Sequence, residues 1–205
     1  MILEFILRWA HVLFGITWIG LLYYFNFIQG EYFKEAEADA KADAVKKLAP
    51  RALWWFRWGA MFTFLTGMYL LHLVGATKNM MGMPFIWMGA LAGIFMFLNV
   101  WLIIWPNQKI VLGLAEGDGP AAAAKAGLAS RTNTLLSGPM LMGMLASKHL
   151  VMGVSDTGFY IAMAIIVALE ANAIVGKMGP MASVKGVIHC SVALTAVLGA
   201  IMVMV

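Results

Sequence analysis

Six long runs of apolar residues alternate along the chain with short polar segments. The runs predict membrane-spanning helices at 2–29, 52–76, 84–105, 131–152, 157–176 and 183–205, because each is about as long as the ~20 residues that cross a bilayer. Proline and glycine lie in the gaps, where they favour helix ends. Pro139 instead lies inside the fourth run, where we expect it to kink the helix and free a carbonyl for a neighbouring helix or water. The pattern predicts an all-α membrane bundle, with 1–205 as a single transmembrane domain.

Two polar segments separate the runs and carry the main soluble parts of the chain. The segment 31–49 mixes acidic residues and lysines with alanines, which predicts a charged, solvated helix. The segment 107–130 is rich in alanine and glycine and predicts a connector of low information content. Neither has the basic and aromatic pattern of a nucleic-acid site, so we expect no nucleic-acid partner.

The composition fits this pattern and excludes a water-soluble domain. Of the 205 residues, 62% are hydrophobic and 12% are charged, against about 25% charged in soluble domains. The positive charges are also strongly sided, which predicts that their side is cytoplasmic and that both termini face outward. Eleven of the 14 lysines and arginines lie on the side reached after the first helix: Lys34, Lys41, Lys46, Lys47, Arg51, Arg57, Lys109, Lys125, Arg131, Lys177 and Lys185.

Cys190 is the only cysteine in the chain. A single cysteine excludes an internal disulfide, a CxxC redox pair and covalent haem attachment through CxxCH. Phosphate-binding glycine loops, HExxH and GxSxG are absent from the sequence, so the common soluble-enzyme chemistries have no motif here and no catalytic residue is identified. A metal or cofactor must therefore be held by other side chains.

All four histidines fall inside predicted spans, where ionisable side chains are costly and tend to be functional. Depth along the predicted helices places His11, His72 and His149 in the outer leaflet, about 13, 6 and 5 Å from its edge. His189 lies near the cytoplasmic side, away from the others. Two imidazoles from facing helices suit a six-coordinate haem b, so His11, His72 and His149 are the candidate metal ligands.

Residues around His11 fit a haem site as well as ordinary helix packing. Gly15 lies one turn after His11 and leaves room for a ring edge or a close helix, and Trp18 lies on the same face. Arg8 points toward the outer water, where haem propionates would lie, and Lys78 in the outer loop is a second candidate for a propionate contact. The alternative interpretation makes the glycine a packing position and Arg8 an interfacial anchor.

Two other groups of residues carry alternative chemistry. The outer loop contains Met80, Met81 and Met83, whose thioethers could bind copper with the histidines, although methionines more often fill gaps in a core.

Near the cytoplasmic ends, Glu170 is the only acid well inside a span, and depth brings Arg57 and Arg131 to its level. A structural salt bridge is the simpler interpretation, and a proton or quinone site is the functional one.

Four stretches resemble a known family. They read LRWAHVLFGITWIG, LAPRALWWFRWGAMFTFLTGMYLL, NVWLIIWPNQKIV and SRTNTLLSGPMLMGMLASKHL. Together they resemble the membrane domain of the bacterial urate hydroxylase family, in a short form, over most of residues 5–150, and the resemblance fades in the last two helices. In long members a c-type cytochrome follows the membrane domain. The resemblance implies a haem or electron-transfer role for His11 and His149, in a bacterial inner membrane.

The chain also departs from that family pattern. It has no CxxCH, and Trp54 and Thr132 stand where the long form is expected to have histidine. These departures argue against carrying the urate substrate over from the resemblance. Membrane redox association is what the resemblance still implies.

The resulting hypothesis is a six-helix, cytochrome b-like membrane protein. It binds haem b near the periplasmic face and exchanges electrons with a c-type cytochrome or a terminal oxidase, within a complex of other membrane subunits or a homo-oligomer surrounded by lipid. An electron-transfer or accessory subunit fits the sequence better than a stand-alone enzyme. Three alternatives remain open: a cofactor-free accessory subunit, the membrane part of a urate-oxidising enzyme, and a copper-binding membrane protein.

Overall fold

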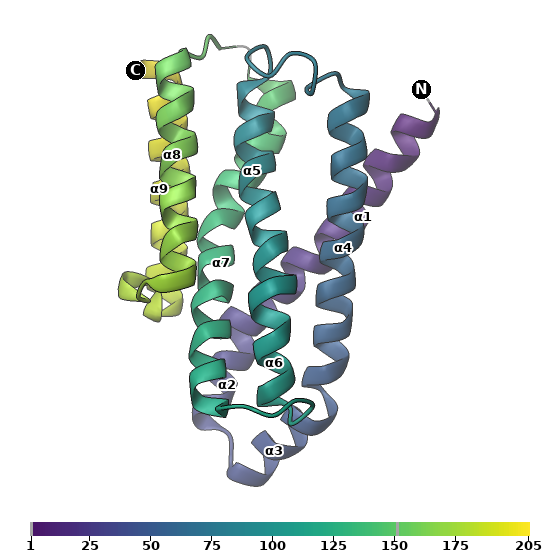
Figure 1. Cartoon of the computed structure of the whole chain (residues 1–205), viewed down its shortest axis with the longest axis vertical. Helices are drawn as coiled ribbons and strands as arrows, with labels where there is room; N and C mark the ends of the chain where they lie inside the picture. The colour runs from purple at the N-terminus through teal and green to yellow at the C-terminus, as the bar shows by residue number, and fades with distance from the viewer. Residues whose placement is uncertain (1, 151) are drawn as a thin grey trace. The chain divides into compact units, whose positions relative to one another are not determined.

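The computed structural model describes residues 2–150 and 152–205, and within them no strand occurs. The prediction of an all-α protein is therefore confirmed (Figure 1). In chain order the elements are α1 (Ile2–Tyr23), the π-helix η1 (Tyr24–Gln29), α2 (Gly30–Glu35), α3 (Ala38–Lys47), α4 (Ala49–Leu73), α5 (Pro84–Leu98), the π-helix η2 (Asn99–Ile104), α6 (Trp105–Val111), α7 (Gly119–His149), α8 (Asp156–Val175), the 3-10 helix η3 (Gly179–Ala182) and α9 (Val184–Met204).

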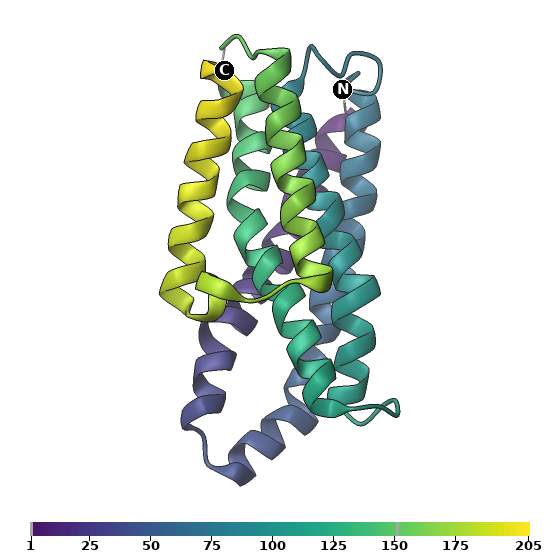
Figure 2. The ribbon, with the colours of Figure 1, turned by 60° about the vertical axis from the view of Figure 1, so that its left-hand side comes forward.

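These elements form two compact units. Unit 1 comprises Met1–Thr66 and Phe97–Ser130, and unit 2 comprises Gly67–Met96 and Arg131–Val205. Within unit 1, α2 and α3 lie at the same end as the loop between α6 and α7 (Figures 1 and 2). Within unit 2, α8 and α9 run side by side in both views.

Four helices of the described chain are long and apolar enough to cross a membrane. They are Ile2–Glu35, Pro84–Val111, Asp156–Val175 and Val184–Met204. The first two are continuous because the π-helical turns η1 and η2 join the α-helices on either side. α4 and α7, which the sequence also predicts to cross, are long but less apolar, since α4 carries Arg51 and Arg57 and α7 begins with a stretch of small residues.

The start of α7 differs from the prediction of 131. The helix begins at Gly119, because the run of alanines after it has high helix propensity and Asp118 caps it. The Asp118 carboxylate accepts a hydrogen bond from the backbone N–H of Ala121 at 3.0 Å. Pro120 in the first turn adds a favourable start. Most of the predicted connector 107–130 is thus helical, belonging to α6 and to the first turns of α7.

The segment 31–49 also differs in detail from the single charged helix that the sequence predicts. The first helix continues to Glu35, and the backbone then becomes extended at Ala36 before α3 starts. α3 is solvated as expected, since none of its residues is buried. At its other end α4 stops at Leu73, earlier than the predicted 76, and Gly75 follows with a φ of 75°, a conformation that favours glycine.

Pro139 in α7 leaves one backbone carbonyl without its helical donor, as the sequence predicts. A proline at this position cannot donate to the carbonyl of Leu135, four residues earlier. The Ser191 hydroxyl of α9 donates to that carbonyl instead, at 2.9 Å and buried from solvent. The neighbouring helix therefore satisfies the carbonyl within unit 2, and this confirms the predicted role of a neighbouring helix.

Glycines bring helices unusually close in unit 2. A Cβ added to Gly143 of α7 would lie 2.6 Å from the backbone N of Gly89 and from the carbonyl O of Phe85 in α5. A Cβ added to Gly89 would lie 2.9 Å from the carbonyl O of Met140. Backbone atoms cannot move aside as a flexible side chain can, so both positions require glycine for this crossing.

Candidate functional site

His11 is the candidate ligand that the structure holds most firmly. It lies on α1 in unit 1, and its imidazole is half-buried. The Nδ1 atom lies 2.9 Å from the carbonyl O of Thr63 and 3.1 Å from the Thr66 hydroxyl, both on α4. A carbonyl only accepts hydrogen bonds, so Nδ1 carries the proton of the neutral ring and donates to Thr63.

The other ring nitrogen of His11, Nε2, has no hydrogen-bond partner among the residues that the structure describes. In the neutral ring this nitrogen keeps its lone pair. A histidine that ligates a metal normally donates its second N–H to a carbonyl or carboxylate, which fixes the ring orientation. The Thr63 carbonyl supplies that contact here, so His11 is arranged to ligate through Nε2.

The helix contacts beside His11 explain why α4 can reach it. A Cβ added to Gly59 of α4 would lie 3.2 Å from the backbone N of Trp18, so the two helices approach closely at this point. The rings of Phe14 and Phe62 lie 4.9 Å apart on the same pair of helices. The packing of α1 against α4 therefore sets the position of the Thr63 carbonyl under His11.

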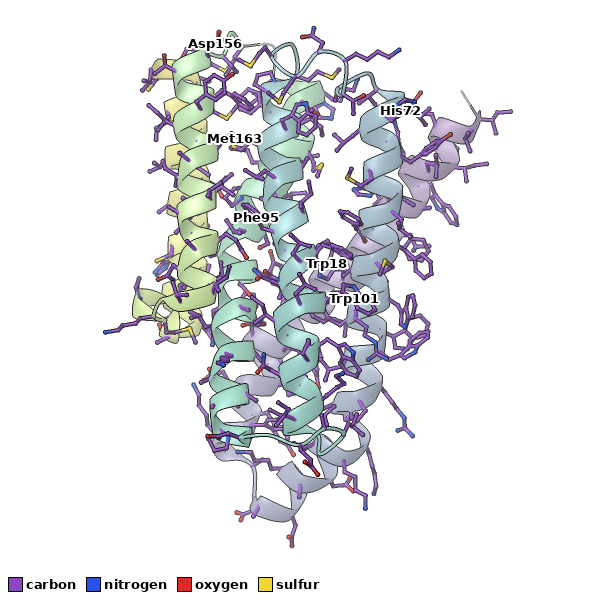
Figure 3. The ribbon with its side chains drawn as sticks, in the orientation of Figure 1. Trp18, His72, Phe95, Trp101, Asp156 and Met163 are labelled. Atoms are coloured by element: carbon purple, nitrogen blue, oxygen red, sulfur yellow. The ribbon has the colours of Figure 1, made fainter. Side chains whose placement is uncertain are left out.

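Gly15 and Trp18 occupy different surroundings on α1. A Cβ added to Gly15 would meet only the methyl carbon of Thr63, at 3.9 Å, which is an ordinary contact. The packing alone thus does not require glycine there. Trp18 is 2% exposed, and its indole Nε1 is buried without a described acceptor. The residue is a core side chain of unit 1 with an unused donor (Figure 3).

The two cationic candidates for propionate contacts are placed differently. Arg8 forms a salt bridge with Glu4, one turn earlier on α1, at 2.7 Å between Nη2 and Oε1. Both side chains are about two-fifths exposed, so the pair neutralises itself at the end of the helix. Lys78 lies in unit 2, in the loop after α4, and is exposed with no partner in the described chain.

His72 and His149 belong to unit 2, whereas His11 belongs to unit 1. His72 is one residue from the end of α4 (Figure 3), and His149 is the last residue of α7. Both are exposed, as is His189 on α9. Among the described residues, the His72 ring lies near that of Tyr69, with the two ring centroids 6.4 Å apart. Among the described residues, no three histidine, cysteine or acidic side chains gather closely enough to hold a metal ion.

The methionines of the outer loop and Glu170 lie in different surroundings. Met83 packs with Trp87 against the buried side chains of Leu71, Ala76 and Ala90, so it fills a gap in unit 2. Met80 and Met81 are exposed. Glu170 of α8 is 7% exposed and lies in unit 2 together with Arg131, whereas Arg57 lies in unit 1 and stacks on Trp105 at 3.9 Å.

Two buried amides in π-helical turns, Asn26 and Asn99, were missed by the sequence analysis. Asn26 lies in η1 and donates to the Ser130 hydroxyl at 2.8 Å in unit 1. Asn99 opens η2 and is fully buried. The sequence signal for these residues was a lone amide inside an apolar run. π-helical turns often occur at functional positions.

Comparison with known proteins places most of the chain in one family. The family model described as urate oxidase N-terminal matches residues 81–205. The match includes α8 and α9, where the resemblance in the sequence motifs fades, and it begins after the stretch that contains His11. No curated protein and no solved structure matches the chain significantly.

Proposed function

The chain belongs to the urate oxidase N-terminal family, and from that premise we propose that it is a short, membrane-embedded form of the family that binds haem b and transfers electrons. It resides in a bacterial inner membrane and binds the haem near the periplasmic face. It exchanges electrons with a c-type cytochrome or a terminal oxidase, as one subunit among other membrane subunits or as a homo-oligomer.

One observation carries this proposal, the arrangement of the His11 ring. Its Nδ1 donates to the Thr63 carbonyl at 2.9 Å, and its Nε2 has no partner among the described residues. Imidazole is a common axial ligand of haem iron, and the hydrogen bond on the far nitrogen orients the ring and increases its basicity. His11 would therefore bind the iron through Nε2.

The surroundings of His11 support a haem site on two further points. Gly15 leaves space one turn along α1, and the buried indole N–H of Trp18, two turns along, lacks an acceptor. A buried donor without a partner costs about 1–3 kcal/mol, which a bound group could recover. Arg8, on the same helix as His11, is paired with Glu4, so a propionate that binds Arg8 would compete with this salt bridge. Bound haem would supply one-electron redox chemistry, and the residues named here would hold and orient it.

The membrane topology is part of the proposal. α4 has 25 residues and α7 has 31, so each exceeds the ~20 residues that span a bilayer. With the four more apolar helices they make six spans, and the sided positive charges then place both termini outside. The arginines of α4 lie in its first half, where their long side chains can reach the membrane surface.

A reduced minus oxidised absorption spectrum of the purified protein tests the proposal, with a pyridine haemochrome assay to identify and count the haem. We expect about one haem b per chain in the wild type, and loss of most of it in His11→Ala. His189→Ala is the matched control and should keep its haem. His72→Ala and His149→Ala test the other two candidate ligands, and a variant that keeps the wild-type spectrum removes that histidine as a ligand.

Two outcomes would contradict the proposal. Well-folded wild-type protein without haem absorbance would favour a cofactor-free accessory subunit, or a copper protein if metal analysis finds copper. Full haem retention in His11→Ala would remove His11 as a ligand. Urate-dependent reduction of bound haem would instead favour the membrane part of a urate-oxidising enzyme.

A further inference from the structure

Arg57 is a cation without an anion. It lies on α4 in unit 1 and is half-buried, and its guanidinium carbon lies 3.9 Å from the centroid of the Trp105 ring on α6. Among residues 2–150 and 152–205, no carboxylate pairs with it and no group accepts a hydrogen bond from it. Stacking satisfies the face of the guanidinium, but it leaves the N–H groups at the edge of the plane unused.

The surroundings of Arg57 are aromatic rather than acidic. The rings of Trp54 and Trp58 lie 6.3 Å apart along α4, and Trp58 lies 5.7 Å from Trp101 of η2. Trp54 and Trp55 are 44% and 60% exposed. In a membrane-embedded helix, large exposed indoles face lipid and gather near the level of the headgroups.

The positions of Arg57 and Trp105 along their helices are consistent with the level of the lipid headgroups. Arg57 is eight residues from the start of α4 at Ala49, or about 12 Å, and Trp105 is six residues from the end of its continuous helix at Val111, or about 9 Å. α4 as a whole is about 37 Å long, which exceeds a hydrocarbon core of about 30 Å. A side chain as long as arginine reaches the surface from this depth.

We propose that Arg57 and Trp105 bind the phosphate of an anionic phospholipid. The stacked guanidinium presents its edge to two phosphate oxygens, an arrangement that gives charge-assisted, bidentate hydrogen bonds. The exposed indoles of Trp54 and Trp55 flank the acyl chains. A phospholipid fits better than a soluble anion, because the apolar aromatic surface and the cation lie on the same helix. The proposal goes beyond haem binding and does not depend on it.

Ligand-dependent thermal stability of the purified full chain in detergent tests the site. Three additions are compared: phosphatidylglycerol, phosphatidylcholine and inorganic phosphate. We expect a concentration-dependent rise in Tm with phosphatidylglycerol only. Arg57→Gln should weaken the apparent affinity for phosphatidylglycerol about tenfold or more, since charge-assisted bonds of this kind are lost.

Arg51→Gln is the matched control. Arg51 lies on the same helix and carries the same charge, but it is exposed and stacks on no ring among the described residues. Its variant should keep the phosphatidylglycerol response. Arg57→Lys retains the charge without the planar fork, so we expect an intermediate loss and a fold close to that of the wild type. If Arg57→Gln does not fold, the lysine variant decides the question.

Each contrary result overturns the proposal in a different way. An equal rise with phosphatidylcholine would mean a general lipid effect, and a rise with inorganic phosphate alone would mean a soluble-anion site. An unchanged response in Arg57→Gln, or in Arg57→Lys where only that variant folds, would remove Arg57 from the site. An equal loss in Arg51→Gln would show that net charge alone attracts the lipid. Haem content measured in the same samples separates these outcomes from failure of the haem proposal.

Discussion

His11 differs from the other three histidines in the partner of a single nitrogen atom. The Thr63 carbonyl accepts from Nδ1, whereas His72, His149 and His189 are exposed and no described residue forms a hydrogen bond with their rings. The same side chain is therefore oriented at one position and free to rotate at the others. Because orientation lowers the entropic cost of ligation, the hydrogen bond is what distinguishes a ready ligand from a surface residue.

We predict that the neutral His11 ring carries its proton on Nδ1 in the protein without bound haem. The reason is that a backbone carbonyl can only accept, and it lies 2.9 Å away. The 15N chemical shifts of histidine-labelled protein measure this directly, since protonated and bare ring nitrogens resonate apart. Assignment uses the signal that disappears in His11→Gln. A ring protonated on Nε2 would show that the contact with Thr63 is not a hydrogen bond.

Thr66→Val provides the control for this assignment. The Thr66 hydroxyl lies 3.1 Å from Nδ1, but it also donates to the carbonyl of Phe62 at 2.6 Å, so it contributes little to the choice of tautomer. We expect the Nδ1–H form to persist in this variant. A switch to Nε2–H would mean that the hydroxyl, rather than the Thr63 carbonyl, determines the tautomer.

The sequence predicted some of these properties of single residues and did not predict others. His11 was recognised because a lone histidine in an apolar run is unusual. Its partner was not predictable, since a backbone carbonyl on another helix leaves no mark in the sequence. The pairing of Arg8 with Glu4 could have been anticipated, because residues four apart share a helix face. The stacking of Arg57 on Trp105 joins positions far apart in the chain, so only the fold reveals it.

At the level of elements, a hydrogen bond links α9 to α7 at the point where Pro139 interrupts the backbone hydrogen bonds of α7. We predict that Ser191→Ala lowers the free energy of unfolding by about 1 kcal/mol, because the Leu135 carbonyl loses its buried donor. Titration of the detergent-solubilised protein with a denaturing detergent measures the loss. Ser147→Ala is the control, since the Ser147 hydroxyl donates within its own helix, to Met144.

A double-mutant cycle makes this prediction specific. Pro139→Ala restores a backbone N–H that can donate to Leu135, so Ser191→Ala should cost less in that background. An equal cost in both backgrounds would show that the serine stabilises the protein in some way other than by satisfying this carbonyl.

The crossing of α5 and α7 gives a second prediction at this level. Gly89→Ala should lower the free energy of unfolding by about 1–3 kcal/mol, because the added methyl group meets the backbone of α7 at 2.9 Å. Gly93→Ala, one turn along α5, should be tolerated, since its nearest neighbour is the flexible Met140 side chain at 3.7 Å. Equal losses in the two variants would contradict the close approach.

The helices themselves were largely predictable, and their ends only in part. α5 begins at Pro84 as expected, because proline fits the first turn of a helix. The early start of α7 was missed because the alanines after Asp118 were taken for a connector, although alanine is the best helix former. The π-helical turns were beyond prediction, since they depend on how neighbouring helices accommodate an extra residue.

At the scale of the whole molecule, apolarity alone identifies four spans, and the proposal of six depends on α4 and α7. Arginines, tryptophans and glycines lower the average hydropathy of α4, and small and polar residues lower that of α7, so length and hydropathy disagree about both helices. Whether α4 crosses is decided by the positions of its two ends. If it crosses, α3 and the loop that follows Leu73 lie on opposite sides of the membrane.

Labelling of single cysteines resolves this point. Cys190 is the only native cysteine, so Cys190→Ser gives a background for Ala42→Cys in α3, Thr77→Cys after α4 and Glu116→Cys before α7, three exposed positions. We predict that a membrane-impermeant maleimide labels intact cells at position 77 and labels positions 42 and 116 only after permeabilisation. The sided positive charges set this direction. Labelling of position 42 in intact cells to the same extent as position 77 would show that α4 does not cross, and the span count and the outward termini would then be wrong.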